Sequence, residues 1–393
     1  MTRGPSGASA AARTGLWLVG ARGSVATTAI VGLLALRAGL VEPVGCVTEH
    51  PPLAEVALPG WRDVVIGGHD IVDTPLDKCA EFLVQGGVLP YGLLPVVRDG
   101  LLGVEAELRP GYHPVSHRGA QVSAVDRLVE DLRSFQARHD LARVVVVNVA
   151  STELPVPTLP EHADLDALGR ALADPGVAVL PPSSLVAYAA LRAGCCFVDF
   201  TPSPGVRLPV LVELAYQQGL PLAGSGGKTG ETLVKSALAP MFAARAGINL
   251  LGGGDGATLG DPVFASSELG SKGRGVTALL GEGVVAPLCI DNVPDLGNWK
   301  TAWDHISFVG FLGVRMTLQF TWTGCDAALA GPLVLDLARL TAAAHAAGHG
   351  GVLPELAFFF KDPMTAGTPV PHGLADQVEE LRRWAATLPQ VSR

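Results

Sequence analysis

The N-terminal part of the sequence contains an apolar run, a glycine-rich turn and an apolar helical segment, in that order. Residues 16–19 are typical of a short buried strand, residues 20–26 form the turn, and the helical segment continues to about residue 38. This order begins a dinucleotide-binding unit, in which amides at a helix N-terminus face a pyrophosphate. A structural turn would have a similar sequence, because Arg22 occupies the second glycine position of GxGxxG. The candidate cofactor residues of the turn are Gly20, Arg22, Gly23, Ser24 and Val25.

Polar residues follow the next apolar runs. Residues 44–48 are expected to form the second strand, and Glu49 follows them, where an acidic residue can hold the adenosine ribose. The runs 144–147 and 196–200 also end in small polar residues. Because the carboxyl ends of parallel strands line the ligand crevice, we expect these ends to complete a dinucleotide site. The residues concerned are Asn148, Ala150, Ser151, Pro202 and Ser203.

Strand-like and helix-like segments alternate from residue 15 to about residue 245, which favours an α/β fold with a Rossmann sheet. Beyond this point the pattern changes. Residues 250–256 form a glycine-rich cluster expected to be a turn, residues 308–322 are a long β-rich run, and residues 333–347 are helical. These segments predict a second domain with its own sheet. Residues 1–13 are expected to be a disordered tail without the apolar core of a secretory signal.

The composition is that of a soluble globular enzyme. The 393 residues are 48% hydrophobic and 17% charged, and the apolar stretch 29–36 meets Arg37 before it could span a bilayer. The net charge of −9 argues against a nucleic-acid surface. The 6 cysteines show no metal-ligand spacing and are interpreted as reduced thiols of a cytoplasmic protein. We therefore expect neither a membrane nor a nucleic-acid partner.

Lysines are scarce and unevenly placed. Five of the six lie in the second half of the chain, each in or near a turn marked by Gly, Ser or Pro. In so acidic a chain this placement predicts a local anion site. The lysines are Lys78, Lys228, Lys235, Lys272, Lys300 and Lys361.

The glycine-rich segment 224–236 brings Lys228 to the start of a predicted helix and places Lys235 within it. The segment almost matches the pattern of a phosphate-binding P-loop. It departs from that pattern at one position, because the pattern requires a glycine five residues before Gly227 and Leu222 stands there. Lys235, in the middle of the helix, is expected to be a structural or surface lysine.

Separated motifs along nearly the whole chain resemble the myo-inositol-1-phosphate synthase family in its short, archaeal-type form. Their order matches that of the family throughout. The matching segments are residues 19–28, 67–70, 148–153, 200–205, 227–235, 238–242, 310–313 and 358–364.

The resemblance implies a Rossmann domain at 14–245 completed by residues 355–393. It also implies a central α+β catalytic and tetramerisation domain at 246–354 with a mostly antiparallel sheet, and hence a homotetramer. In that family NAD is used and restored within one turnover. Glucose 6-phosphate is oxidised at C5, enolised toward C6, closed by aldol attack on the C1 aldehyde, and reduced again.

Several residues match the family's active site. The resemblance gives Lys272, Lys300 and Lys361 as active-site lysines, with Asp255, Asp304 and Asp326 as acidic residues that orient them. A lysine cluster suits this chemistry, because enolate, alkoxide and phosphate all require cationic donors. Two purely structural alternatives stay open. In the first, Lys300 is a solvated residue at the start of a helix, and in the second, Asp326 is a helix N-cap. The substrate phosphate is expected at Lys228, Thr229, Gly230, Lys272 and Lys300.

The chain departs from the family at three positions. Gly226 stands where the family has a carboxylate, Glu268 where it has a lysine, and Asn298 where it has an aspartate. Glu268 can accept a proton at C5, but it cannot donate a cationic hydrogen bond to an alkoxide. In a helix, Glu268 and Lys272 would also be an ordinary i,i+4 ion pair.

These departures suggest a specialised member altered around the sugar. The hypothesis favoured is fructose 6-phosphate, whose C6 enolate would attack the C2 ketone and close a five-membered carbocycle, as nucleoside-antibiotic biosynthesis requires. The alternatives are ordinary inositol phosphate synthase acting on glucose 6-phosphate, a non-catalytic binder of NAD and sugar phosphate, and a polyol-phosphate dehydrogenase. A divalent metal stays open, because no ligand cluster has diagnostic spacing.

Overall fold

A seven-stranded parallel sheet forms the larger body of the computed structural model, which describes residues 12–257, 284–285, 287–367 and 369–391. The strand order is β11-β6-β5-β4-β1-β2-β3, so the chain reverses its direction of winding between β1 and β4. Such a switch point opens a crevice at the carboxyl ends of the strands. The strands are β1 (Thr14–Val19), β2 (Val64–Asp70), β3 (Leu108–Pro110), β4 (Arg143–Asn148), β5 (Cys196–Asp199), β6 (Pro221–Gly224) and β11 (Gly351–Val352).

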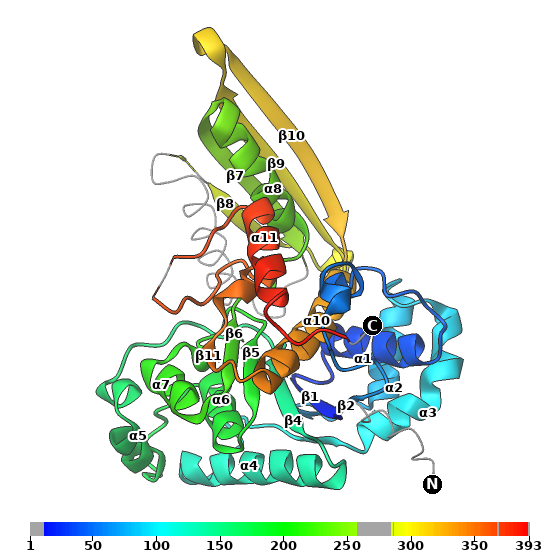
Figure 1. Cartoon of the computed structure of the whole chain (residues 1–393), viewed down its shortest axis with the longest axis vertical. Coiled ribbons are helices and arrows are strands. Elements are labelled where there is room, and N and C mark those ends of the chain that lie inside the picture. Colours follow the sequence, from blue (N-terminus) through cyan, green and yellow to red (C-terminus); the bar gives the residue numbers. More distant parts are fainter. Residues whose placement is uncertain (1–11, 258–283, 286, 368, 392–393) are drawn as a thin grey trace, which may run out of the picture.

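Helices cover both faces of this sheet (Figure 1). Strand β1 shows why, since Leu16 and Leu18 enter one core while Trp17 enters the other, as expected for a strand buried on both faces. The first core takes in α1 (Ser24–Arg37), α2 (Leu76–Gln85), α3 (Leu94–Glu105), α10 (Asp326–Ala346) and α11 (Leu374–Ala385). The second takes in α4 (Gln121–Arg138), α5 (Leu165–Leu172), α6 (Pro182–Arg192) and α7 (Pro209–Gln218). The expected α/β fold with a Rossmann-type sheet is confirmed.

A second sheet of four strands projects from this body in the order β10-β9-β7-β8 (Figure 1). Strand β9 (Lys300–Val309) pairs antiparallel with both β7 (Gly247–Ala257) and β10 (Arg315–Gly324), whereas β8 (Leu288–Asn292) is parallel to β7. Helix α8 (Gly230–Arg245) contributes to the small core under one face, against Ile306 and Phe320. The expected mostly antiparallel second sheet is confirmed.

The prediction of a strand at residues 44–48 is wrong. Val47–Glu49 form one turn of 3-10 helix, and the strand next to β1 is β2, residues 64–70. Pro43 and Gly45, the latter with a φ of 86°, bend the chain before the apolar residues can enter the sheet. Thr48 instead donates a hydrogen bond to the buried Asp336 of α10, so the segment packs against a helix.

The prediction of a turn at residues 250–256 is also wrong, because these residues lie within β7. The glycines there are explained by the neighbouring strand: a Cβ at Gly253 would lie 2.3 Å from Asp304 Oδ1. The run 308–322 divides between β9 and β10 at a turn in which Leu312 has a φ of 62°. The aromatic segment before Lys361 forms a 3-10 helix, Pro354–Phe359.

Two elements within the range expected for the second domain pack with the larger body instead. Helix α10 packs in the first core and β11 pairs with β6. By length and composition α10 would suffice to cross a membrane, but 78% of its apolar window is buried inside the protein, so it is a core helix here. The domain limits otherwise stay predictions, and most of the expected tail, residues 1–11, lies outside the described residues.

Candidate active site

The first turn of α1 lies at the switch point between β1 and β4. Its N-cap is Gly23, which has no side chain, and the turn carries no acidic residue, so a ligand can approach its amides. Gly20 has a φ of 81°, and a Cβ there would lie 2.7 Å from the Ala150 Cα. This close approach of two backbones forms a cradle that a side chain would fill, and it fits the diphosphate of a dinucleotide.

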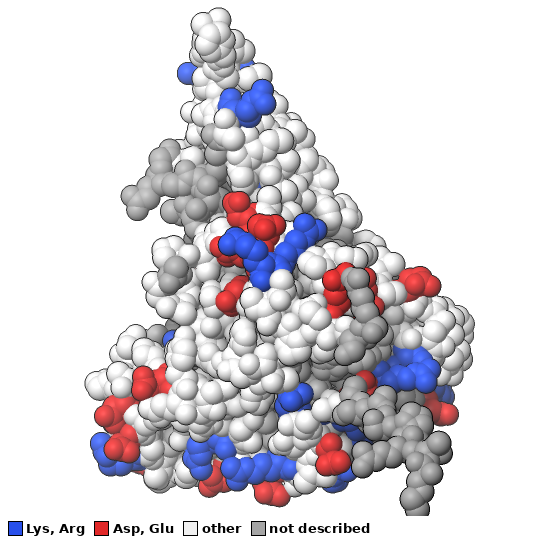
Figure 2. Space-filling view, in the orientation of Figure 1, with Lys and Arg blue, Asp and Glu red and all other residues white. Residues whose placement is uncertain are grey.

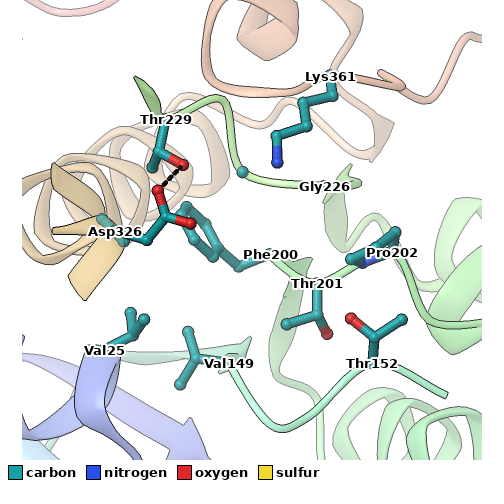
Figure 3. A pocket seen from close by; sticks show the side chains of 12 residues that line it. Val25, Val149, Thr152, Phe200, Thr201, Pro202, Gly226, Thr229, Asp326 and Lys361 are labelled. Atoms are coloured by element: carbon teal, nitrogen blue, oxygen red, sulfur yellow. Dashed lines mark hydrogen bonds between the residues drawn. The ribbon is translucent and has the colours of Figure 1, made fainter. Parts of the chain in front are cut away.

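Two pockets flank this turn. The first, here the Ser24 pocket, has a volume of about 230 Å³ and is lined by Arg22, Ser24, Thr27, Val72, Thr74, Cys79, Phe82, Leu83 and Asn298. The second, here the Val25 pocket, has a volume of about 140 Å³ (Figure 3). It is lined by Val25, Val149, Thr152, Phe200, Thr201, Pro202, Gly226, Gly227, Thr229, Asp326, Ala330 and Lys361. A dinucleotide whose diphosphate lies over Ser24 and Val25 would reach both pockets.

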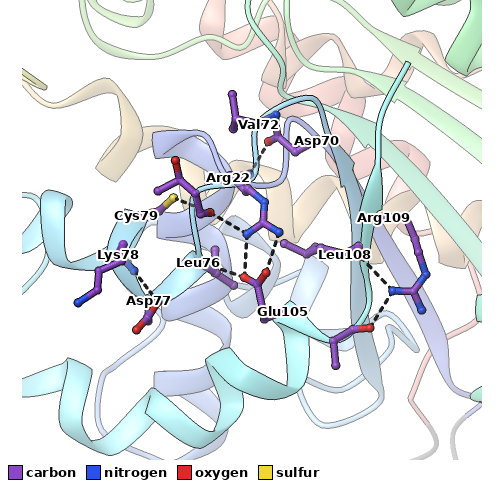
Figure 4. A network of polar contacts seen from close by, with 12 residues as sticks. Arg22, Asp70, Val72, Leu76, Asp77, Lys78, Cys79, Glu105, Leu108 and Arg109 are labelled. Atoms are coloured by element: carbon purple, nitrogen blue, oxygen red, sulfur yellow. Dashed lines mark hydrogen bonds and ion pairs between the residues drawn. The ribbon is translucent and has the colours of Figure 1, made fainter. Parts of the chain in front are cut away.

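Arg22 is held by Glu105 in a two-pronged ion pair, with both N–O distances 2.7 Å (Figure 4). This hydrogen bonding lowers the pKa of Glu105 below its usual range and raises that of Arg22. The Arg22 guanidinium also donates to the Thr74 carbonyl oxygen at 2.8 Å. Arg22 therefore forms one wall of the Ser24 pocket with its charge already matched by a carboxylate.

The acidic residue at the end of the strand next to β1 is Asp70, which sequence reasoning missed. It accepts hydrogen bonds from the backbone amides of Arg22, at 2.7 Å, and Val72, at 3.0 Å (Figure 4). Glu49, which we expected in this role, instead pairs with Arg339 of α10 at 2.6 Å. The available signal was the apolar run 64–68, which leads into Asp70 two residues later.

The ends of β4 and β5 are joined by a buried polar network. Asn148 Nδ2 donates to Asp199 Oδ1 at 2.9 Å and to Thr201 Oγ1 at 3.3 Å. Burial raises the pKa of Asp199 to about 8, although the hydrogen bond from Asn148 opposes the shift. The neutral acid is thus the prevalent form of Asp199 at neutral pH.

The cofactor residues predicted at these strand ends occupy different places. Pro202 lines the Val25 pocket together with Thr201, which was not predicted as a cofactor residue. Ser203 is buried and accepts from the Glu153 amide at 3.1 Å. Ser151 is exposed, and Ala150 packs against Gly20. Asn148 and Ser203 therefore support the lining residues from beneath.

The glycine-rich loop after β6 places Lys361 in the site. Its residues 225–227 pair with residues 360–362, and the Lys361 amide donates to the Gly226 carbonyl oxygen at 2.6 Å. Gly227 is required here, because a Cβ would lie 2.1 Å from the Phe200 ring. Figure 3 shows the Lys361 amine directed into the pocket, between Gly226 and Thr229. Leu222 lies fully buried within β6, which explains why the P-loop pattern fails at that position.

Four elements meet on the other side of this pocket. Asp326, the first residue of α10, accepts a hydrogen bond from Thr229 Oγ1 at 3.0 Å (Figure 3). The other carboxylate oxygen of Asp326, Oδ2, lies 3.7 Å from Lys300 Nζ. The same Nζ lies 3.0 Å from Asp255 Oδ2. Lys300 begins β9, so it is not a helix start. The N-cap of α10 is Cys325, so Asp326 is not an N-cap either.

A second charged cluster lies beside the first. Lys235 of α8 is buried and contacts Glu231 and Asp304, the latter at 2.6 Å. Burial lowers the pKa of Lys235, but the two carboxylates raise it overall. Burial and the neighbouring Glu231 raise the pKa of Asp304. Lys235 joins α8 to the second sheet and is structural rather than a surface residue.

The remaining predicted phosphate ligands are only partly brought together. Lys228 is buried, and its Nζ donates to Gln377 of α11; burial lowers its pKa to about 7. Among the described residues that line the Val25 pocket, Thr229 is present and Lys228 is not. Gly230 has a φ of 50° and opens α8. Lys272 and Glu268 lie outside the described residues. Among the residues that the structure describes, no group of three His, Cys, Asp or Glu side chains could hold a metal.

Comparison with known proteins identifies relatives along the whole chain. Residues 14–385 match the family described as Myo-inositol-1-phosphate synthase. The chain is 33% identical to Inositol-3-phosphate synthase 1 of Bacteroides thetaiotaomicron over 391 positions, covering 90% of each chain.

Solved structures show the same fold. The inositol-3-phosphate synthase of Caenorhabditis elegans has a TM-score of 0.84 at 20% identity, covering 96% of this chain and 86% of the other. A myo-inositol-1-phosphate synthase-related protein of Thermotoga maritima has a TM-score of 0.74 at 24% identity, with 97% and 100% covered.

Proposed function

The chain belongs to the myo-inositol-1-phosphate synthase family, and from this premise we propose that it converts a hexose 6-phosphate into a cyclitol phosphate. Family membership makes it an NAD-binding enzyme of the isomerase type that cyclises a sugar phosphate. The proposed steps are oxidation at C5, enolisation toward C6, an intramolecular aldol reaction and reduction at C5. The observation that carries the proposal is the meeting of Lys361, Lys300, Asp326 and Thr229 beside the first turn of α1.

The cofactor residues proposed from the structure are the α1 turn, Asp70 and the lining residues at the ends of β4 and β5. NAD, when bound, supplies the hydride acceptor and donor for C5. Asp70 is placed to accept hydrogen bonds from the adenosine ribose, because it stands at the end of the strand next to β1. Thr201, held by Asn148, would orient the group in the Val25 pocket.

The charged residues have different proposed roles in binding and catalysis. Lys361 is directed into the pocket, where its ammonium can donate to the C5 oxygen or to the aldol alkoxide. Lys300 pairs with Asp255 and Asp326, and its ammonium would bind the substrate phosphate or the enolate oxygen. The backbone amides at the N-terminus of α8 would provide neutral donors to the same phosphate, and Thr229 would join them by turning its hydroxyl from Asp326 to the phosphate. Lys272 and Glu268 stay proposals from the sequence.

Fructose 6-phosphate is the substrate favoured. Gly226 lines the pocket beside Lys361 and has no side chain, where the family resembled has a carboxylate. Its φ of 73° would strain most other residues, so the space beside Lys361 is built into the loop. A ketose needs room at this end, because its C2 acceptor carries an additional carbon. Attack of the C6 enolate on C2 forms the C2–C6 bond and closes a five-membered ring, of the kind that nucleoside antibiotics contain.

The experiment is to incubate the pure protein with NAD and either glucose or fructose 6-phosphate, following phosphate esters by 31P NMR and NADH by absorbance. A cyclitol phosphate from fructose 6-phosphate without accumulating NADH supports the proposal. The same result with glucose 6-phosphate alone would establish the ordinary inositol phosphate synthase. Stoichiometric NADH would indicate a polyol-phosphate dehydrogenase, and binding without any product would indicate a non-catalytic binder.

A homotetramer in the cytoplasm is part of the proposal. The second sheet has one face toward α8, and Figure 2 shows few charged side chains over the upper projection that these elements form. Its other face and its tip expose apolar residues, as expected of a surface that pairs with another copy. These residues are Trp303, Phe311, Leu312, Val314 and Met316. Light scattering of the purified protein tests the assembly.

A further inference from the structure

The chain that leads into β9 crosses from the second sheet to the larger body. Trp299 Nε1 donates to the carbonyl oxygen of Gly86, the C-cap residue of α2, at 3.0 Å. A Cβ at Gly86 would lie 2.9 Å from Asn298 Nδ2, so the absence of a side chain on Gly86 permits the contact. Lys300 follows directly. Three consecutive residues therefore join α2, a cofactor pocket and the sugar-phosphate site.

Asn298 lies at the first turn of α1. Its Oδ1 accepts a hydrogen bond from Ser24 Oγ at 3.2 Å, and Ser24 is the first residue of that helix. Among the described residues that line the Ser24 pocket, Asn298 is the one that does not come from the larger body. The second sheet thus contributes a polar side chain at the place where the cofactor diphosphate is expected.

An amide suits this position because it can both accept and donate hydrogen bonds. The oxygens of a diphosphate only accept, so they would take the Ser24 hydroxyl proton that Asn298 now accepts. A rotated Asn298 amide can then donate its Nδ2 protons to the same diphosphate. The aspartate that the family resembled has at this position has no proton to donate, so direct donation to the diphosphate would be particular to this chain.

We propose that Asn298 is a cofactor-binding residue that donates to the diphosphate of NAD, and that Trp299 is the positioning residue that holds it there. The consequence for catalysis rests on the proposed function. Because Lys300 is two residues from Asn298, at most about 7 Å along an extended chain, binding of the diphosphate would also fix the backbone that carries Lys300. The cofactor and the sugar phosphate would then bind cooperatively.

The first test measures binding of NAD, ADP and adenosine by calorimetry to wild type, Asn298→Asp and Asn298→Ala. The matched control is Asn249→Asp, which adds the same charge at an exposed position of β7. Asn298→Asp and Asn298→Ala both lose the amide donor, so each should weaken NAD and ADP about tenfold, with adenosine changed less than about twofold. Equal loss for adenosine, or NAD binding within about twofold of the control, would overturn the assignment.

The second test uses Trp299→Phe, which keeps an aromatic ring but loses the N–H donor to Gly86, with Trp303→Phe on β9 as control. Trp299→Phe should reduce the factor by which NAD strengthens sugar-phosphate binding, and leave the melting temperature of the ligand-free protein near that of the control. An unchanged factor would overturn the positioning role.

The two proposals can fail separately. Wild type that binds NAD but cyclises no hexose phosphate would refute the proposed function and leave the Asn298 result interpretable. Wild type that does not bind NAD would refute both.

Discussion

The cofactor edge of the large sheet and its junction with the second sheet are built in opposite ways. At the cofactor edge the chain presents glycines, backbone amides and small polar side chains, and the cation Arg22 is matched by Glu105. At the junction, a buried lysine of α8 and a partly buried lysine of β9 face carboxylates from other elements. Nearly all of the cofactor edge comes from one continuous body. The junction requires four elements to meet.

The difference follows from what each site must bind. A dinucleotide diphosphate is a fixed anion, and helix amides hold it without a buried charge. A sugar whose oxygens gain and lose charge during reaction requires cations that can follow that charge. Buried cations in turn require carboxylates, or desolvation would neutralise them. Substitutions at the junction should therefore have larger effects than substitutions at the cofactor edge.

The largest effect is expected from Lys361→Ala. Loss of the donor directed into the pocket should lower turnover at least about 10²–10³-fold. NAD affinity should change little, because the contacts proposed for the diphosphate and the ribose lie at the first turn of α1 and at Asp70. Product formation by 31P NMR and NAD titration measure the two quantities. Lys78→Ala, at an exposed lysine, is the control. Near-normal turnover would remove Lys361 from the site.

Lys235→Met should destabilise the fold without acting on the chemistry directly. Removal of the cation leaves Glu231 and Asp304 buried together, which should cost about 3–5 kcal/mol in the free energy of unfolding. Urea denaturation measures it, with Lys78→Met as control, since that ion pair is exposed to solvent and should contribute little to stability. Equal stability of the two variants would show that the buried cluster is unimportant.

Asp199→Asn tests the cofactor edge through the pH dependence of the free energy of unfolding. The pKa of Asp199 is about 8 in the folded protein and near 3.8 in the unfolded chain, so between these values the folded state holds one proton more. Its contribution to stability therefore falls as pH rises through this window, by up to about 1.4 kcal/mol per pH unit.

Asparagine keeps the acceptor for Asn148 but does not titrate. Asp199→Asn should thus gain stability relative to wild type at pH 8 compared with pH 5. Urea midpoints at the two pH values check it, and parallel pH dependence of the two proteins would contradict the shifted pKa.

The smallest effect distinguishes two acidic residues. Asp70→Asn should weaken NAD binding about tenfold if Asp70 holds the ribose hydroxyls. Glu49→Gln should leave NAD affinity within about twofold, because Glu49 pairs with Arg339 on α10. Calorimetric titration with NAD compares them directly. A loss in Glu49→Gln alone would restore the interpretation drawn from the sequence.

Local patterns predicted those parts of the fold whose determinants are local. The strand, turn and helix at residues 14–37 and the alternation of elements through β6 all appear. The second strand was misplaced, because residues 44–48 and 64–68 are both short apolar runs. What separates them is the contact of Thr48 with Asp336, nearly three hundred residues later. The glycines of β7 were taken for a turn because Asp304, which requires them, lies on another strand.

The sequence by itself determined which chemical groups this protein has: few lysines, a glycine loop that carries one of them, and Gly226 in place of a carboxylate. The first two facts follow from composition and local spacing, and the third follows from the resemblance to the family. Only the tertiary structure decided which groups meet. Pairing of the glycine loop with residues 360–362 brings Lys361 to the pocket, Gln377 turns Lys228 toward α11, and Asn298 reaches Ser24 from the second sheet. Each of these contacts joins residues far apart along the chain, and their geometry exists only once the two sheets have packed together.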